Sequence, residues 1–165
     1  MATYDIEESS SVNGLILIII LNYMPKCSMN QLACALYLVR FSKVLSKFLS
    51  KEEEVDFLNK VPEWELGNLD AMLVPYINQK YDIRFIRGIK ELFAKGLIQI
   101  ENEFVQLISK KEISSGSETI MRIQHKADYA SRLVMGMNIE LLNKQISRIV
   151  GEEQWGTFSS STVSQ

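Results

Sequence analysis

The fold is decided by residues 81–108, which read YDIRFIRGIKELFAKGLIQIENEFVQLI. Apolar residues recur at helical spacing in the first half, and Gly96 follows at a position where helices commonly end in a left-handed residue. Apolar and polar residues then alternate around Asn102, a residue that readily adopts a positive φ in a tight turn. The stretch therefore predicts a helix over Tyr81–Lys95 and a β-hairpin at Leu97–Ile108.

Two more helices are predicted on the N-terminal side of this stretch. Asn13 can cap a helix over Gly14–Met24, and a turn is expected at Pro25–Ser28 because proline cannot continue the helix. Ser28 is a suitable N-cap for the next helix, from Met29 to about Leu49.

The order of these elements predicts the fold class: mainly α with a small β-wing, in which a winged helix-turn-helix-like core is followed by long C-terminal helices. The Ile83–Lys95 helix would hold the recognition position, and the hairpin would be the wing. The C-terminal helices come from an apolar helical pattern over Glu118–Val150, which Gly136 and Asn138 can divide.

One domain is expected over residues 13–150, between flexible tails at 1–12 and 151–165. Inside it, residues 51–78 are predicted to be an acidic connector, because Glu52–Glu54 are acidic and Pro62 interrupts helical continuity. Seven apolar residues are expected to be buried together in the core: Leu15, Ile18, Leu32, Leu36, Ile89, Phe93 and Leu97.

Composition and motifs argue against an enzyme. The 165 residues carry a net charge of -2, unlike a strongly basic autonomous nucleic-acid binder. His125 is the single histidine and would have to be the base of any hydrolytic site, yet no nucleophile motif accompanies it. The sequence has no P-loop, and its two cysteines form no CxxC pair, so we expect no cofactor and no metal.

Cytoplasmic localisation is expected from three features of the sequence. Residues 1–11 lack the pattern of a signal peptide, and the apolar run Leu15–Leu21 is far shorter than the roughly 20 residues that span a bilayer. Cys27 and Cys34 are best explained as the reduced thiols of a cytosolic protein. The short apolar run predicts no membrane association.

Lys80, Arg84 and Arg87 are the candidate nucleic-acid-binding residues. Spacing by four and three would place them on one side of the predicted recognition helix, where they could neutralise DNA phosphates. An ordinary solvated face opposite the isoleucines explains the same spacing, and Glu91 on that side favours this second interpretation. Both interpretations remain open.

Trp64, Leu66, Met135 and Met137 are the candidate partner-binding residues. Trp64 and Leu66 belong to a polar segment that is poorly suited to bury them, and exposed aromatic side chains are enriched at interfaces. The methionines could adapt to an irregular partner surface or could simply pack on the core.

Several stretches of the sequence, taken together and in their order along the chain, resemble the middle components of bacterial three-component ABC systems. These systems include Lamassu-type defence complexes, in which the corresponding protein is the small subunit. The resemblance covers roughly residues 13–150 and rests on the Gly14–Met24 helix, Gln31-Leu32-Ala33 after Ser28, Gly88–Ile98, Phe104–Leu107 and Asp128–Leu133. It implies a non-catalytic accessory subunit that links an SMC-like ATPase to an effector, often a nuclease, in defence against phage or plasmids.

Two other functions compete with that of an assembly subunit. A winged-helix transcription regulator would dimerise through its C-terminal helix and bind an operator on its own, with a steep salt dependence. An enzyme of an unrecognised kind is the third alternative, and the single histidine argues against it.

Overall fold

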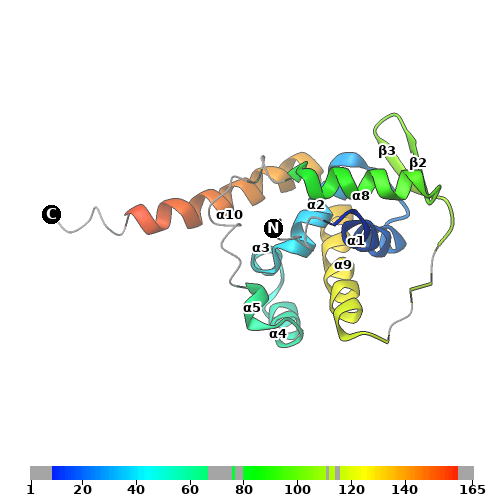
Figure 1. The fold of residues 1–165 in the computed structure, drawn as a ribbon. Helices are drawn as coiled ribbons and strands as arrows, with labels where there is room; N and C mark the ends of the chain where they lie inside the picture. Colours follow the sequence, from blue (N-terminus) through cyan, green and yellow to red (C-terminus); the bar gives the residue numbers. More distant parts are fainter. Residues whose placement is uncertain (1–8, 67–75, 77–79, 111, 114–115, 160–165) are drawn as a thin grey trace, which may run out of the picture.

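The computed structural model describes residues 9–66, 76, 80–110, 112–113 and 116–159, without the side chains of Trp64 and of residues 152–159. The chain is mainly helical, with one small three-stranded antiparallel sheet. In chain order, the elements are α1 (Ser10–Tyr23), β1 (Lys26–Ser28), α2 (Met29–Arg40), α3 (Ser42–Ser46), α4 (Lys51–Lys60), α5 (Glu63–Leu66), α8 (Ile83–Ala94), β2 (Ile98–Glu101), β3 (Phe104–Leu107), α9 (Glu118–Gly136) and α10 (Ile139–Ser159) (Figure 1).

The predicted hairpin is confirmed. Strands β2 and β3 pair antiparallel, with Ile98 opposite Leu107. Both special backbone positions are as expected: Gly96 ends α8 with φ 67°, and Asn102 turns the hairpin with φ 56°.

The sheet also contains a strand where the sequence predicted a turn. Lys26–Ser28 forms β1, which pairs antiparallel with β3 so that the strand order is β1-β3-β2. The turn prediction at Pro25–Ser28 is wrong. A strand of three residues is too short to show the alternation of apolar and polar residues, and its hydrogen-bonding partner comes from the distant hairpin. Leu107 N also donates to Pro25 O at 2.8 Å, which extends the contact by one residue.

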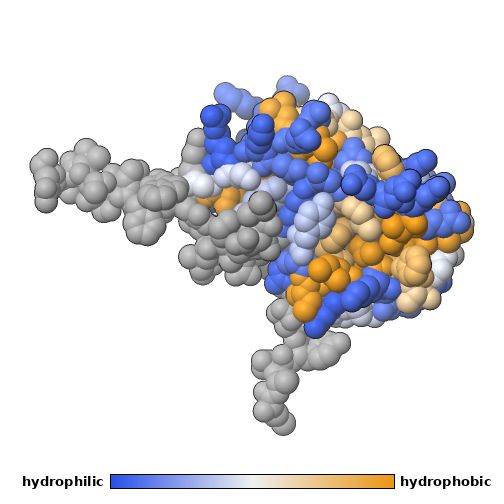
Figure 2. Space-filling view, turned by 90° about the horizontal axis from the view of Figure 1, so that it is seen from above, coloured by the Kyte–Doolittle hydropathy of each residue, from blue (hydrophilic) through white to orange (hydrophobic). Residues whose placement is uncertain are grey.

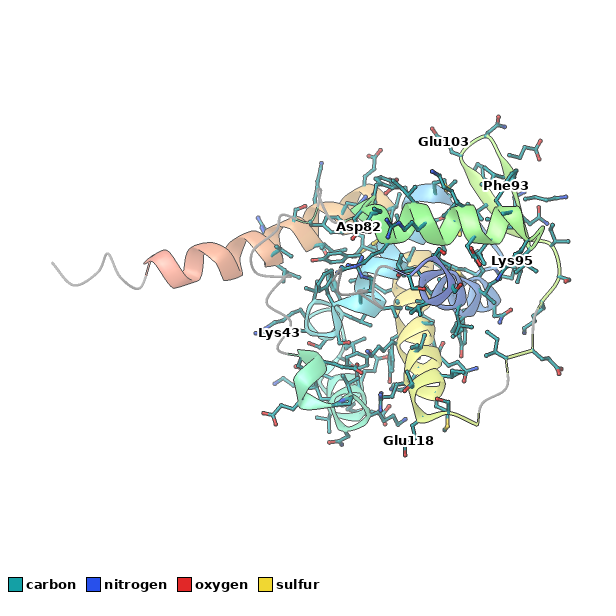
Figure 3. The ribbon with its side chains drawn as sticks, in the orientation of Figure 1. Lys43, Asp82, Phe93, Lys95, Glu103 and Glu118 are labelled. Atoms are coloured by element: carbon teal, nitrogen blue, oxygen red, sulfur yellow. The ribbon has the colours of Figure 1, made fainter. Side chains whose placement is uncertain are left out.

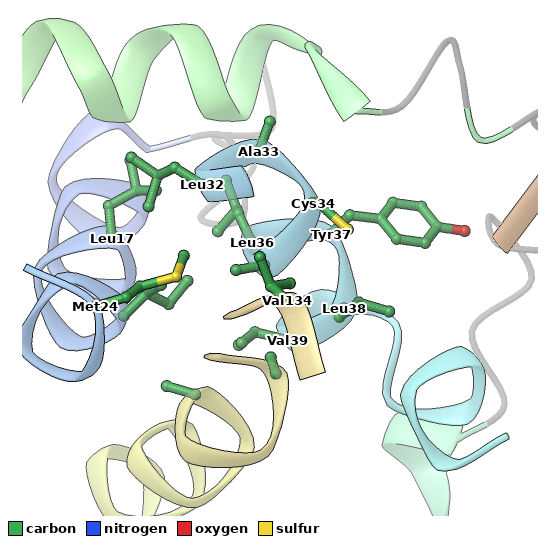
Figure 4. Close-up of a cluster of buried hydrophobic side chains, with 14 of the residues drawn as sticks. Leu17, Met24, Leu32, Ala33, Cys34, Leu36, Tyr37, Leu38, Val39 and Val134 are labelled. Carbon is green, nitrogen blue, oxygen red and sulfur yellow. The ribbon is translucent and has the colours of Figure 1, made fainter. Parts of the chain in front are cut away.

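The core lies where α1, α2, α8 and α9 meet. Leu17 and Met24 from the α1 side, Leu32 and Leu36 from α2 and Val134 from α9 are each at most 1% exposed, and they point into one cluster (Figure 4). Such a core supplies most of the folding free energy, at roughly 25 cal/mol for each Å² of apolar surface buried.

Two glycines allow α1 and α8 to approach closely. A methyl group on Gly88 would lie 2.6 Å from Leu17 Cδ1 and 3.2 Å from the backbone carbonyl carbon of Asn13. On the other helix, a methyl group on Gly14 would lie 3.3 Å from Glu91 Cγ. The two backbones are therefore closer together than larger residues would permit.

The predicted N-terminus of the first helix is wrong. The helix begins at Ser10 rather than Gly14, inside the predicted flexible tail, and residues 1–8 of that tail lie outside the described residues. Asn13 is no cap: it is 1% exposed beneath α8, and its Nδ2 donates to Ser9 O at 3.0 Å.

The predicted core is right for Ile18, Leu32, Leu36 and Ile89, which are buried, whereas Leu97 is only partly buried. It is wrong for Leu15 and Phe93, which are 39% and 59% exposed. On α8 the buried residues are Phe85, Gly88, Ile89 and Leu92. Neighbouring residues in a helix point about 100° apart, so burial of Leu92 turns Phe93 outward.

The helix predicted over Met29–Leu49 is divided. It begins as expected, with a capping box between Ser28 and Gln31. At Phe41 the backbone leaves the helical conformation (φ -111°, ψ 74°), and α3 follows directly.

Part of the predicted acidic connector is helical. Ser50 and Glu53 form a second capping box, with Ser50 N donating to Glu53 Oε2 at 3.1 Å, and α4 begins there. The sequence carries this capping signal at Ser50 and Glu53, and Pro62 ends the helix rather than excluding one. The remainder of the connector, 67–75 and 77–79, lies outside the described residues.

The long C-terminal pattern is divided as predicted, after Gly136 and before Ile139. Helix α10 continues to Ser159, past the predicted end of the domain at Val150 (Figure 1). No helix in the described part of the chain combines the length and apolarity needed to cross a bilayer.

We predict that Gly88→Val destabilises the protein by about 1–3 kcal/mol, because the added side chain would have to displace Leu17 Cδ1 and press against the backbone of Asn13. Urea unfolding measures the change. Gly136→Val is the matched control, since an added Cβ there meets nothing within 4 Å, and we expect a change within about 0.5 kcal/mol. Equal effects at the two glycines would show that the helix crossing is not tight.

Candidate partner and nucleic-acid surfaces

Helix α8 is held firmly at its first turn. Asp82 Oδ1 accepts hydrogen bonds from Arg84 N at 3.1 Å and Phe85 N at 3.2 Å, which caps the helix. Its other oxygen accepts a 3.0 Å hydrogen bond from Arg40 Nη1 at the end of α2. Asp82 thus fixes one end of α8 to α2, while Phe93 and Lys95 lie at the hairpin end (Figure 3).

The outward face of α8 is apolar and basic. Ile83, Ile86 and Phe93 are 45%, 44% and 59% exposed, and Arg87 and Lys90 are exposed between them. Their spacing of three and four places all five on one side of the helix, opposite the buried Phe85, Ile89 and Leu92. We call these five residues the α8 outer face.

The apolar part of the α8 outer face was missed in the sequence. The sequence pattern predicts Ile89 and Phe93 in the core and does not single out Ile83 or Ile86, although α8 holds more large apolar residues than one stripe can bury. That excess was the available signal. Seen from above, the surface of the protein carries separate apolar patches among hydrophilic ones (Figure 2).

The three predicted nucleic-acid-binding residues do not form one basic face. Lys80 precedes the N-cap of α8 and is only 8% exposed. The Arg84 side chain is 13% exposed, with Nη1 at 3.8 Å from Asp82 Oδ2. Arg87 is the exposed member of the three, and Glu91 forms an ion pair with Lys95 at 2.8 Å.

The outer face of the hairpin is mostly polar. Lys26, Gln99, Glu101, Phe104 and Gln106 line a shallow hollow of about 250 Å³ there, with Asn102 at its edge. The Lys26 ammonium lies 5.9 Å from the centre of the Phe104 ring, a cation–π distance. This hollow contains one lysine and one glutamate and has no strong charge preference.

The predicted partner-binding residues are in different environments. The side chain of Trp64 lies outside the described residues, and Leu66 is partly buried against the core. Met137 also packs against the core, whereas Met135 is 59% exposed near the end of α9. Met135 is therefore the accessible methionine of the pair.

Helix α5 is attached to α9 by ion pairs. Lys126, which is 7% exposed, donates a hydrogen bond from Nζ to Glu65 Oε2. The other oxygen of Glu65, Oε1, lies 3.5 Å from Arg122 Nε. Breaking a buried pair by removing one partner typically costs about 3–5 kcal/mol, so these carboxylate contacts constrain the connector strongly.

His125 lies at the junction between α4 and α9. Its ring stacks on Phe57 at 6.0 Å and meets Tyr129 edge-on at 5.0 Å, while Nε2 lies 3.8 Å from Asp56 Oδ2. Burial and then the charge of Lys60 lower the pKa of His125. The contacts place this histidine at the edge of the core.

The other nucleophilic and metal-binding residue types give no site. Burial raises the pKa of Cys27 to about 12 and that of Cys34 to about 11, so both thiols are protonated at neutral pH. Within the described residues, no three His, Cys, Asp or Glu side chains are grouped as metal ligands would be.

Comparison with protein-family models, curated proteins and solved structures gives no match to this chain. The resemblance to three-component ABC systems therefore rests on the sequence motifs alone.

We predict that the protein becomes less stable as the pH falls below about 6.5, the ordinary pKa of histidine. The native pKa of His125 is lowered, so the unfolded chain takes up its proton first and acid favours unfolding. Urea unfolding between pH 5.5 and 7.5 measures this. The charged groups that influence His125 are Asp56, Lys60, Asp128 and Arg132.

His125→Phe is the control, because it keeps the ring on Phe57 and removes the only histidine of the chain. The variant should have a flatter stability profile over this pH range. The same slope in both proteins would contradict the assignment of the effect to His125.

Proposed function

We propose that this chain is a non-catalytic accessory subunit whose winged-helix-like core docks on another protein through the α8 outer face. Two observations support the winged-helix arrangement: the order α1, β1, α2, α8, β2, β3, and the pairing of β1 with β3. In that arrangement α8 holds the recognition position and β2–β3 is the wing.

The single observation that carries the proposal is the apolar surface of α8. Three large apolar side chains on one exposed helix face favour a protein partner, since patches of this kind mark interaction sites. A helix that reads DNA would instead present polar and basic residues to base edges and phosphates. Arg87 and Lys90 add a positive charge that suits a partner with acidic residues around an apolar centre.

The resemblance to three-component ABC systems suggests the partners. They would be an SMC-like coiled-coil ATPase and an effector, often a nuclease, acting against phage or plasmids in the cytoplasm. In such an assembly the catalytic steps belong to other chains, and this subunit needs no cofactor. Trp64, Leu66, Met135 and Met137 remain candidates for a second contact with these partners, and Met135 is the most exposed of the three whose side chains are described.

A winged-helix transcription regulator is the alternative, and Arg87 and Lys90 are the observation in its favour. The net charge of -2 and the burial of Lys80 count against DNA binding by this chain alone. Contact with DNA inside the assembly, through Arg87 and its neighbours, is compatible with the proposal.

We predict that Ile86→Glu abolishes co-purification with a coiled-coil ATPase encoded beside this chain, because it places a carboxylate at the centre of the docking face. The two chains are co-expressed and isolated through a tag on the ATPase. Met121→Glu is the matched control, since Met121 is 55% exposed on α9, and this variant should co-purify normally.

Circular dichroism and thermal melting establish that both variants fold. An intact complex with Ile86→Glu would refute docking through α8. Tight binding of duplex DNA by the isolated chain, weakened by Arg87→Gln together with Lys90→Gln, would favour the regulator instead.

A further inference from the structure

Helix α4 carries a second exposed apolar surface. Val55 and Leu58 are 61% and 36% exposed, although both side chains are apolar. Glu52 precedes Val55 at the same spacing of three, so the three residues lie on one side of the helix, opposite the buried Phe57. We call Glu52, Val55 and Leu58 the α4 outer face.

The helices that carry the two outer faces have opposite charge. Helix α4 contains four carboxylates against two lysines, whereas α8 contains three cations against one carboxylate. Glu53 Oε2 accepts a hydrogen bond from Ser50 N, and Asp56 pairs with Lys60 at 3.2 Å. No ion pair in the described part of the chain involves Glu52, which is exposed. It is therefore the carboxylate of α4 that is best placed to meet a cation of another molecule.

The two outer faces complement each other. On α8, the exposed Lys90 lies between the apolar side chains of Ile86 and Phe93, and on α4, Glu52 lies beside Val55 and Leu58. Contact between the faces would cover apolar side chains on both helices and bring opposite charges together at the edge. Complementary charges of this kind favour one relative orientation of the two surfaces over others.

The two outer faces cannot meet within one molecule. Helix α8 runs along the top of the protein in the view of Figure 1, and α4 lies at the bottom, with α3 and much of α9 at heights between them. The occupant that these surfaces fit is therefore a second copy of the chain. Because the two surfaces differ, the contact would be heterologous, with the α8 end of one copy on the α4 end of the next.

We propose that copies of this chain associate head to tail, with the α8 outer face of one copy on the α4 outer face of the next. Repetition of this contact closes a ring of two or more copies or continues as a filament. Few residues meet, so the association is weak and depends on concentration. The contact would compete with the proposed docking partner for α8, but it concerns the chain alone and does not rest on that function.

Sedimentation equilibrium of the full chain tests the association, over the range of roughly 1 μM to 1 mM in which weak contacts form. The average mass of the wild type should rise with concentration above the 18.9 kDa of a single copy. Added salt should reduce the rise, because salt screens attraction between exposed charges. Met121→Glu, at a 55% exposed position of α9, is the matched control and should associate as the wild type does.

A mixing experiment tests the head-to-tail arrangement. Ile86→Glu removes the α8 outer face, and Val55→Gln with Leu58→Gln removes the α4 outer face, with glutamine chosen because helices accommodate it well. Each variant alone should associate about tenfold or more weakly than the wild type. An equimolar mixture should form a one-to-one pair, because the intact α4 outer face of the first variant binds the intact α8 outer face of the second.

Several results would overturn the proposal: a wild type that stays monomeric, a glutamine variant of α4 that associates normally, or a mixture no larger than its components. Glu52→Gln changes one exposed side chain, so it should fold normally, weaken the association at low salt and reduce its salt dependence. An unchanged salt dependence would overturn the pairing of the two faces. A monomeric chain that still co-purifies with the ATPase would overturn self-association alone and leave the docking function in place.

Discussion

The close crossing of α1 and α8 is the constraint on which the rest of the structure depends. Gly88 and Gly14 let the two helices approach until atoms of one helix lie 2.6–3.3 Å from the position that a Cβ on the other would take. Packing this tight fixes the rotation of α8 about its axis, because turning it would bring a larger residue into the crossing. The rotation then decides which residues of α8 are buried and which face outward.

The position of the hairpin follows from the same crossing. Gly96 ends α8 at once, so β2 begins two residues later and the turn at Asn102 returns β3 along it. Strand β3 then pairs with β1, which directly follows the loop after α1. The sheet thus links the C-terminal end of α1 to the C-terminal end of α8. At the other end of α8, the Arg40–Asp82 ion pair joins this helix to α2.

Local signals in the sequence predicted the elements that depend on a single residue type. The end of α8, the hairpin turn and the division between α9 and α10 each follow from a glycine or asparagine in the right place. What could not be predicted depends on tertiary contacts. Strand β1 is too short to have a period, and the burial of Lys80 is not signalled by its own polar neighbourhood in the sequence. The choice of Leu92 over Phe93 for the core depends on the rotation that Gly88 permits.

Two carboxylates at the junction of α4, α5 and α9 are already paired with neighbouring side chains. Glu65 is committed to Lys126 and Arg122, and Asp56 accepts hydrogen bonds from Lys60 and Tyr129. Groups that are already paired stabilise the fold but are not available to move protons on a substrate.

The apolar groups of α8 are in the opposite situation. Ile83, Ile86 and Phe93 are about half exposed, so a partner that covered them could add roughly half of the 1.5–3 kcal/mol that full burial of such a side chain provides. A partner that binds only the folded state also stabilises it by mass action. The exposed apolar side chains of α8 are therefore the feature that the proposed docking on a partner would use.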